Sequence, residues 1–201
     1  MKKIIQVVLV TFLIVQSCKN ESKYPNELSD SDQTQAEMKE QALTTTLRPI
    51  YEVLEQDPEY NNFLKLVNIA DYFDQIKALD NVMVFAPTAA GIDKLTDTEY
   101  ADLKLPQNMQ RLRNVLSYHI VEGEINSASI ISTIKASGEP MRLKTIQGAN
   151  ISLNIDDNQL TITDEFTNTY IISDPDQKGS NGVVHGIDGV LVPQPDDKII
   201  K

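Results

Sequence analysis

The sequence predicts an α+β domain in which helices come first and an antiparallel group of strands comes last. Apolar residues recur mostly at helical spacing between about residues 47 and 134, and they alternate at a spacing of two beyond residue 140. Helices and strands that are segregated along the chain are typical of the α+β class. No internal repeat is visible, so we expect one copy of this unit, formed by residues 47–193.

The first half of the chain carries the helical pattern. Ile50 and Leu54 share one helical face, and that helix ends at Asp57 and Pro58, which begin the next helix as its cap and first residue. Four further apolar faces are predicted. They consist of Tyr60, Phe63, Leu64 and Val67; Tyr72, Phe73 and Ile76; Met109, Leu112, Val115 and Leu116; and Ile130, Ile131 and Ile134.

One buried strand interrupts these helices, from Val82 to Ala86, and Pro87 closes it. Cap residues mark the starts of the helices that follow. We expect Thr88 to cap a helix that runs through Ile92 and Leu95, residues 96–99 to form a capping box, and Ser127 to cap the helix around Ile130.

The second half of the chain carries the strand pattern. We expect strands at residues 141–146, 151–155, 160–162, 170–172 and 183–192, with a turn at Asp156, Asp157 and Asn158. Residues 174–182 are the longest polar connection between them. Because loops carry recognition on rigid scaffolds, Asp174, Asp176 and Lys178 are candidate binding residues, although a plain solvent loop is the alternative.

The first residues indicate export. Lys2 and Lys3 precede an apolar run that is too short to span a membrane and is typical of a signal peptide, residues 1–17. The residues Val15 to Cys18 resemble the bacterial lipobox, which implies cleavage before Cys18 and attachment of lipid to it. In lipoproteins of this type an Asp directly after the cysteine favours retention in the inner membrane. Because Lys19 stands there instead, we expect the protein to be attached to the outer membrane of the cell envelope, and the face of that membrane is left open. An ordinary secretory signal is the alternative.

Residues 18–46 are polar and predict a flexible tether, and residues 194–201 predict a polar tail. The balance of 18 basic and 29 acidic residues argues against nucleic acid as a partner. Cys18 is the only cysteine, so neither an intramolecular disulfide nor a thiolate zinc site is expected. We expect no cofactor and no metal.

Three segments in order resemble the fasciclin domain family. Residues 84–88 (VFAPT) resemble its first signature, residues 116–123 (LSYHIVEG) its central Tyr-His segment, and residues 181–193 (NGVVHGIDGVLVP) its closing signature. The residues that carry the structural part of this resemblance are Phe85, Pro87, Thr88, Gly182, His185 and Gly189. The chain departs from the family at residues 89–92, where Gly91 is expected to weaken a helix by up to about 1 kcal/mol.

This resemblance implies a wedge-shaped β-sandwich with flanking helices, used for adhesion or for binding proteins or glycans at the cell surface, and no enzymatic activity. It makes Tyr118 and His119 candidate adhesion residues, because some members use this segment for cell adhesion. A second hypothesis is an accessory role in an outer-membrane glycan-uptake or envelope complex.

The remaining candidates have plainer alternatives. Asp188 lies among apolar residues, so either backbone N–H groups satisfy its carboxylate or it is a contact residue. His119 and His185 are expected to be buried and hydrogen-bonded. A hydrolase that uses Ser117 or Ser180, one of these histidines and Asp188 is the weakest hypothesis, because no nucleophile elbow is present and so no catalytic residue is assigned. The acidic residues of the second half lack the register of a calcium loop.

Overall fold

The computed structural model describes residues 47–194 of the chain. The predicted signal peptide, Cys18, the tether and all of the predicted tail except Gln194 lie outside the described residues. Among the described residues, no helix is long and apolar enough to cross a membrane.

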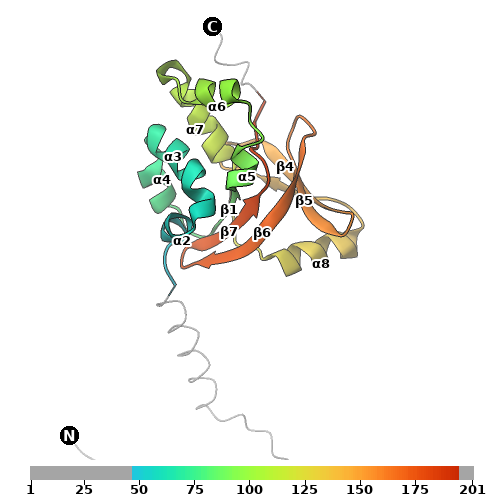
Figure 1. Ribbon diagram of the computed structural model, residues 1–201. Helices are drawn as coiled ribbons and strands as arrows, with labels where there is room; N and C mark the ends of the chain where they lie inside the picture. Colours follow the sequence, from blue (N-terminus) through green and yellow to red (C-terminus); the bar gives the residue numbers. More distant parts are fainter. Residues whose placement is uncertain (1–46, 195–201) are drawn as a thin grey trace, which may run out of the picture. The chain divides into compact units, whose positions relative to one another are not determined.

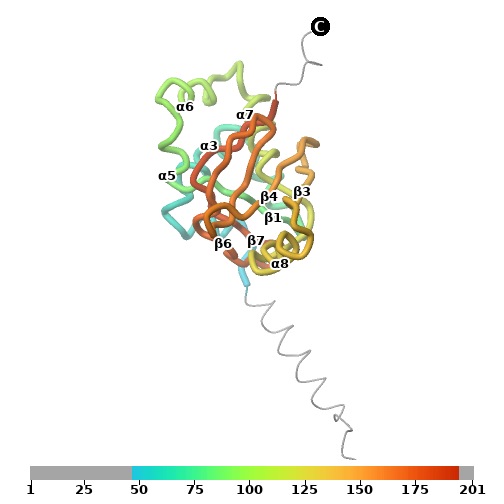
Figure 2. Tube along the Cα trace, turned by 90° about the vertical axis from the view of Figure 1, so that its right-hand side faces the viewer, coloured from blue at the N-terminus to red at the C-terminus, as the bar shows by residue number. Residues whose placement is uncertain are grey.

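Helices fill the first half of the domain, as predicted. Their bounds are α2 Ile50–Gln56, η1 Pro58–Tyr60, α3 Asn61–Ile69, α4 Phe73–Lys77, α5 Ala89–Ile92, α6 Asp97–Leu103, η2 Pro106–Asn108, α7 Met109–Tyr118 and α8 Ser127–Ser137. Helices α2 to α7 gather on one side of the strands, and α8 lies apart from them (Figure 1). Figure 2 also places α8 at the end of the sheet that lies away from α6.

The strands form one sheet of seven in the order β2-β1-β7-β6-β5-β4-β3. Their bounds are β1 Val82–Pro87, β2 Ile120–Glu122, β3 Met141–Lys144, β4 Asn150–Asp156, β5 Gln159–Thr163, β6 Thr169–Gly179 and β7 Gly182–Ile187. A bridge between Val121 and Thr145 joins the two edges, so the sheet wraps into a near-barrel. The predicted α+β class is confirmed.

The neighbouring strands β1 and β7 contribute side chains to two apolar clusters. Val84 packs in the cluster on the helical side together with Val190, whereas Phe85 packs in the other cluster with Leu191. Every residue of both strands is buried. Burial on both faces explains why these strands have nearly continuous apolar sequences rather than alternating ones. The three segments that resemble the fasciclin signatures therefore meet at β2, β1 and β7.

Several predicted helix starts are confirmed by the side-chain hydrogen bonds. The Asp57 carboxylate accepts from the Glu59 N–H at 3.0 Å, although the first turn after it is a 3₁₀ helix. Thr96 and Glu99 form the reciprocal capping box. The Thr88 hydroxyl accepts from the Gly91 N–H at 3.3 Å, but α5 ends at Ile92 and does not reach Leu95.

The predicted cap of α8 is wrong by one residue. Asn126 is the cap, because its side-chain oxygen accepts from the Ser129 N–H at 2.8 Å. Ser127 instead donates from both its N–H and its hydroxyl to the carboxylate of Asp176. Both residue types suit a cap, and this long-range contact determines which of the two serves.

The predicted loop at residues 174–182 is also wrong. Residues 174–179 continue strand β6, and only Ser180 and Asn181 remain as a turn. The pairing of β6 with β7 shifts register between Asp174 and Gln177, so β6 carries a bulge there. The last strand ends at Ile187 rather than at Val192. The parallel pairing of β1 with β7 is a further feature that the predicted antiparallel group did not include.

Candidate functional site

His119 links the central segment to the end of the closing signature. Its Nδ1 lies 2.7 Å from the Val115 carbonyl oxygen, and its Nε2 accepts from the Leu191 N–H at 3.0 Å. This pattern fixes the neutral ring with its proton on Nδ1. The side chain is fully buried, and burial lowers its pKa to about 4. His119 is therefore a neutral structural residue, as expected of a buried histidine.

His185 is held in the opposite tautomer. Its Nδ1 accepts from the Asp176 N–H at 3.2 Å, so its Nε2 carries the proton and donates to the Ile125 carbonyl at 3.1 Å. The ring stacks on Phe85 with centroids 5.6 Å apart. Burial lowers the pKa of His185 below its usual value. The expectation of a buried, hydrogen-bonded histidine is confirmed here as well.

Tyr118, the neighbour of His119, is also fully buried. Its hydroxyl donates to the Asn150 carbonyl at 2.8 Å and accepts from the Glu165 N–H at 3.1 Å. Burial of the ring raises the pKa of this phenol above its usual value. Neither Tyr118 nor His119 presents a side chain to a partner in the folded domain, so the structure favours their structural role over direct adhesion.

The carboxylate of Asp188 is satisfied at the end of β7. It accepts from the Ile171 N–H at 2.6 Å and pairs with Lys94 at 2.7 Å. One backbone N–H group and the ammonium group of Lys94 thus satisfy this charge, so the expected backbone contact is present but is completed by an ion pair that was not expected. The adjoining Gly189 is required by packing, because a Cβ there would lie 1.9 Å from the ring of Tyr170.

The structure does not assemble the hydrolase triad. The ring nitrogens of both histidines bond backbone groups, as described above, and the hydroxyl of Ser117 donates to the Asn114 carbonyl at 3.0 Å. Ser180 lies in the β6–β7 turn, where its N–H donates to the Arg48 carbonyl. Within residues 47–194, no group of three His, Cys, Asp or Glu residues is placed to hold a metal ion.

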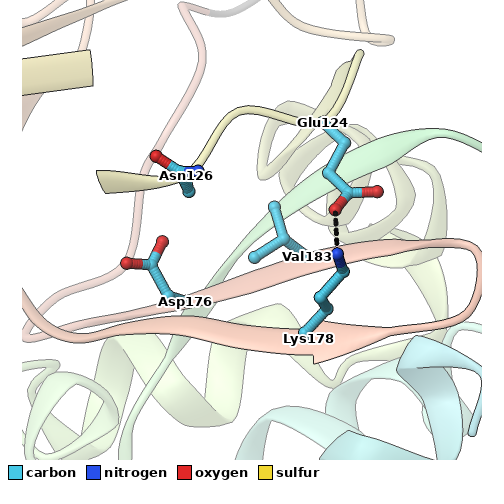
Figure 3. A pocket seen from close by; sticks show the side chains of 5 residues that line it. All are labelled: Glu124, Asn126, Asp176, Lys178 and Val183. Atoms are coloured by element: carbon cyan, nitrogen blue, oxygen red, sulfur yellow. Dashed lines mark ion pairs between the residues drawn. The ribbon is translucent and has the colours of Figure 1, made fainter. Parts of the chain in front are cut away.

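A polar pocket of about 140 Å³ lies between β6 and the connection from β2 to α8. Its lining residues are Glu124, Asn126, Asp176, Lys178 and Val183 (Figure 3). Lys178 points toward Glu124, with Nζ and Oε1 3.8 Å apart, and both side chains are well exposed. We call this hollow the β6 pocket. Two of the three candidate residues from the predicted loop line it.

The third candidate, Asp174, has a structural role instead. Its carboxylate accepts from the hydroxyl of buried Tyr60 at 2.7 Å and from the side-chain amide of Gln177 at 2.8 Å. Burial of the ring and, after it, this contact with Asp174 raise the pKa of the Tyr60 phenol. Asp174 therefore connects the helical layer to β6. Both of its carboxylate oxygens already accept hydrogen bonds within the domain, so it is a poorer candidate for contact with a partner than Asp176 or Lys178.

Asp176 is held rigidly at the edge of the β6 pocket. Its carboxylate accepts from the N–H of Ser127 at 2.7 Å and from the hydroxyl of the same residue. Its own N–H donates to His185 beneath it. The backbone of Asp176 has a φ of +67°, a left-handed conformation that is uncommon for a residue other than glycine. The surrounding contacts therefore determine its position.

The β6 pocket offers polar groups of both signs to a ligand. Two carboxylates, one side-chain amide and one ammonium group surround the apolar side chain of Val183, and hydrogen bonds hold two of these groups, Asp176 and Asn126, in place. Glu124 and Asn126 were not among the predicted site residues. They precede α8 in the sequence and face β6 only because the fold brings the two segments together, so no local pattern could have indicated them.

Comparisons with known proteins agree with the three signature segments. The family model of the fasciclin domain matches residues 58–193. The protein sll1483 of Synechocystis sp. is 29% identical over 153 residues, which cover 76% of this chain and 78% of that protein. Human periostin is 27% identical over 151 residues, which cover 73% of this chain and 16% of periostin.

A solved structure shows the same fold. The FAS1 domain pair from the insect cell adhesion molecule fasciclin I superposes with a TM-score of 0.61 at 20% sequence identity. The match covers 75% of this chain, and the chain spans about half the length of that structure, 52%. The predicted fasciclin-like fold is confirmed. With its three signature segments adjacent in one sheet and the family match over most of the domain, the chain belongs to the fasciclin domain family.

Proposed function

We propose that this protein is a non-catalytic binding module of the bacterial cell envelope that adheres to a protein or glycan through the β6 pocket. The observation that carries the proposal is the contrast between that pocket and the two histidines. The pocket places charged and polar groups at the surface, and Ser127 holds Asp176 among them in place, whereas His119 and His185 are buried and bonded to the backbone. A carboxylate that is already held in place suits recognition, because it needs little ordering on binding.

The family supports an adhesive function rather than an enzymatic one. The solved structure with the same fold comes from a cell adhesion molecule. At 20% sequence identity this structural match shows a shared fold and does not show a shared function. The adhesive function of the present chain is therefore our inference.

We also propose that lipid on Cys18 anchors the protein to the outer membrane. The lipobox-like residues Val15 to Cys18 support this proposal. Acyl chains gain about 0.8 kcal/mol per buried CH₂, so two or more anchor a protein stably. Cells fed a labelled fatty acid should label the wild-type protein and should not label Cys18→Ala. Equal labelling of the two proteins, or no labelling of either, would disprove the anchor.

Binding is tested with the chain from Lys19 onward, which contains the whole described domain. We expect the immobilised chain to retain at least one member of a panel of purified glycans, matrix proteins and envelope extract at physiological salt. Bovine serum albumin on the same support serves as the control. If the chain retains nothing from any of the three classes above this control, the proposed function is wrong.

A further inference from the structure

The bulge of β6 places one peptide bond directly over a buried histidine. Asp174 and Gln177 are the register partners of β7 on either side of the bulge, and Pro175 and Asp176 have no partner there. The N–H of the Pro175–Asp176 peptide donates to Nδ1 of His185 at 3.2 Å. This bond requires His185 to be neutral, because an imidazolium has a proton on both nitrogens and cannot accept.

The same peptide bond carries a conformational cost. Its present orientation gives Asp176 a φ of +67°, which is unfavourable for a residue with a Cβ. Turning the peptide plane over changes this φ by about half a turn, which returns Asp176 to the broad allowed region of negative φ. The turn also exchanges the Asp176 N–H for the Pro175 carbonyl oxygen at the position that faces His185. A carbonyl oxygen there accepts the hydrogen bond that protonated Nδ1 must donate.

We propose that protonation of His185 turns over the Pro175–Asp176 peptide bond at the edge of the β6 pocket. In neutral solution the His185 acceptor holds this peptide in the orientation that gives Asp176 its left-handed conformation. Loss of that acceptor removes this restraint and adds repulsion between two N–H groups. The peptide then turns about the line that joins its two Cα atoms, so its N–H and its carbonyl oxygen exchange sides while the Asp176 carboxylate keeps its place on Ser127.

The charges around His185 favour the protonated state once the peptide has turned. Asp176 of β6 has its Oδ1 3.8 Å from Nδ1, and Glu124 and Lys178, which pair with each other, line the pocket above. On β1 the ring stacks on Phe85, which carries no charge. Desolvation opposes protonation, so the change occurs below the usual titration range of histidine and not at neutral pH.

The consequence for a ligand rests on the proposed function, whereas the conformational change itself does not. A ligand that bonds the outward backbone group of this peptide beside the β6 pocket meets a carbonyl oxygen in neutral solution and an N–H group in acid. The proposal is therefore tested on the free protein, so that failure of the switch and failure of binding are separate results.

The test is an NMR titration of the isotope-labelled chain from Lys19 onward, between pH 7.5 and 4.5. We expect the His185 ring to change from the Nε2–H tautomer to the doubly protonated form. With the same midpoint, the three-bond HN–Hα coupling of Asp176 should change from that of a positive φ to that of a negative φ. Protonation of His185 with Asp176 still at positive φ would overturn the proposal, and so would global unfolding before His185 titrates.

Discussion

Replacing Gly91 with Ala is expected to destabilise the domain by about 3 kcal/mol or more, enough to unfold a marginally stable protein. A Cβ at this position would lie 2.7 Å from both the Gly189 nitrogen and the Ile187 oxygen, and 3.0 Å from the Asp188 carbonyl carbon. All three atoms belong to the backbone at the end of β7, so no side-chain rotation relieves the overlap. Urea unfolding followed by circular dichroism measures the loss.

The control for this prediction is Ala90→Gly in the same short helix. Ala90 is exposed, so this change tests helix propensity alone and should cost no more than about 1 kcal/mol. Propensity by itself predicts the opposite sign for Gly91→Ala, a gain of about 1 kcal/mol. A Gly91→Ala protein at least as stable as the wild type would show that α5 does not pack against the closing signature as described.

Acid should destabilise the domain through His119. Its pKa is lowered from 6.5 to about 4 by burial, so between these values the unfolded chain binds a proton that the folded chain does not. Stability therefore falls as the pH falls through this window, by roughly 1.4 kcal/mol per pH unit and about 3 kcal/mol in all. At pH 8 the histidine is neutral in both states and contributes no pH dependence.

The variant His119→Gln isolates this contribution. The glutamine side chain cannot be protonated in this range, and its oxygen can replace Nε2 as acceptor for the Leu191 N–H. We expect the variant to be less stable at pH 8 but to lose less stability than the wild type between pH 6.5 and 4. Carboxylates titrate in both proteins and cancel in the difference. Parallel curves of unfolding free energy against pH would contradict a buried neutral His119.

The sequence indicates the buried strands better than the exposed one. Strand β1 was predicted because its apolar run is buried on both faces and ends at Pro87. Strand β6 was mostly missed, because Asp174, Pro175 and Asp176 read as a turn. Their side chains lie at the surface or in hydrogen bonds across the bulge, so the alternation that reveals a half-buried strand is absent.

Gly91 shows why helix propensity alone was a poor guide. From the sequence alone, Gly91 is a residue that weakens a helix. The reason that only glycine fits there is the backbone at the end of β7, which leaves no room for a Cβ and is brought against α5 by the fold. The residues of the β6 pocket likewise come together only through contacts between distant parts of the chain. The sequence indicates Asp176 and Lys178 as polar residues of a predicted loop, whereas Glu124 and Asn126 join them from about fifty residues earlier in the chain. Such long-range proximity follows from strand order, which one sequence does not specify.

The most direct test of the β6 pocket as the contact surface is the dissociation constant of the strongest panel ligand for two lysine variants. Lys178→Ala removes the ammonium group from the pocket, and Lys65→Ala removes the same charge from the exposed side of α3. We predict that binding weakens about tenfold or more for Lys178→Ala and changes less than about twofold for Lys65→Ala. Equal affinities for the two variants would contradict the account.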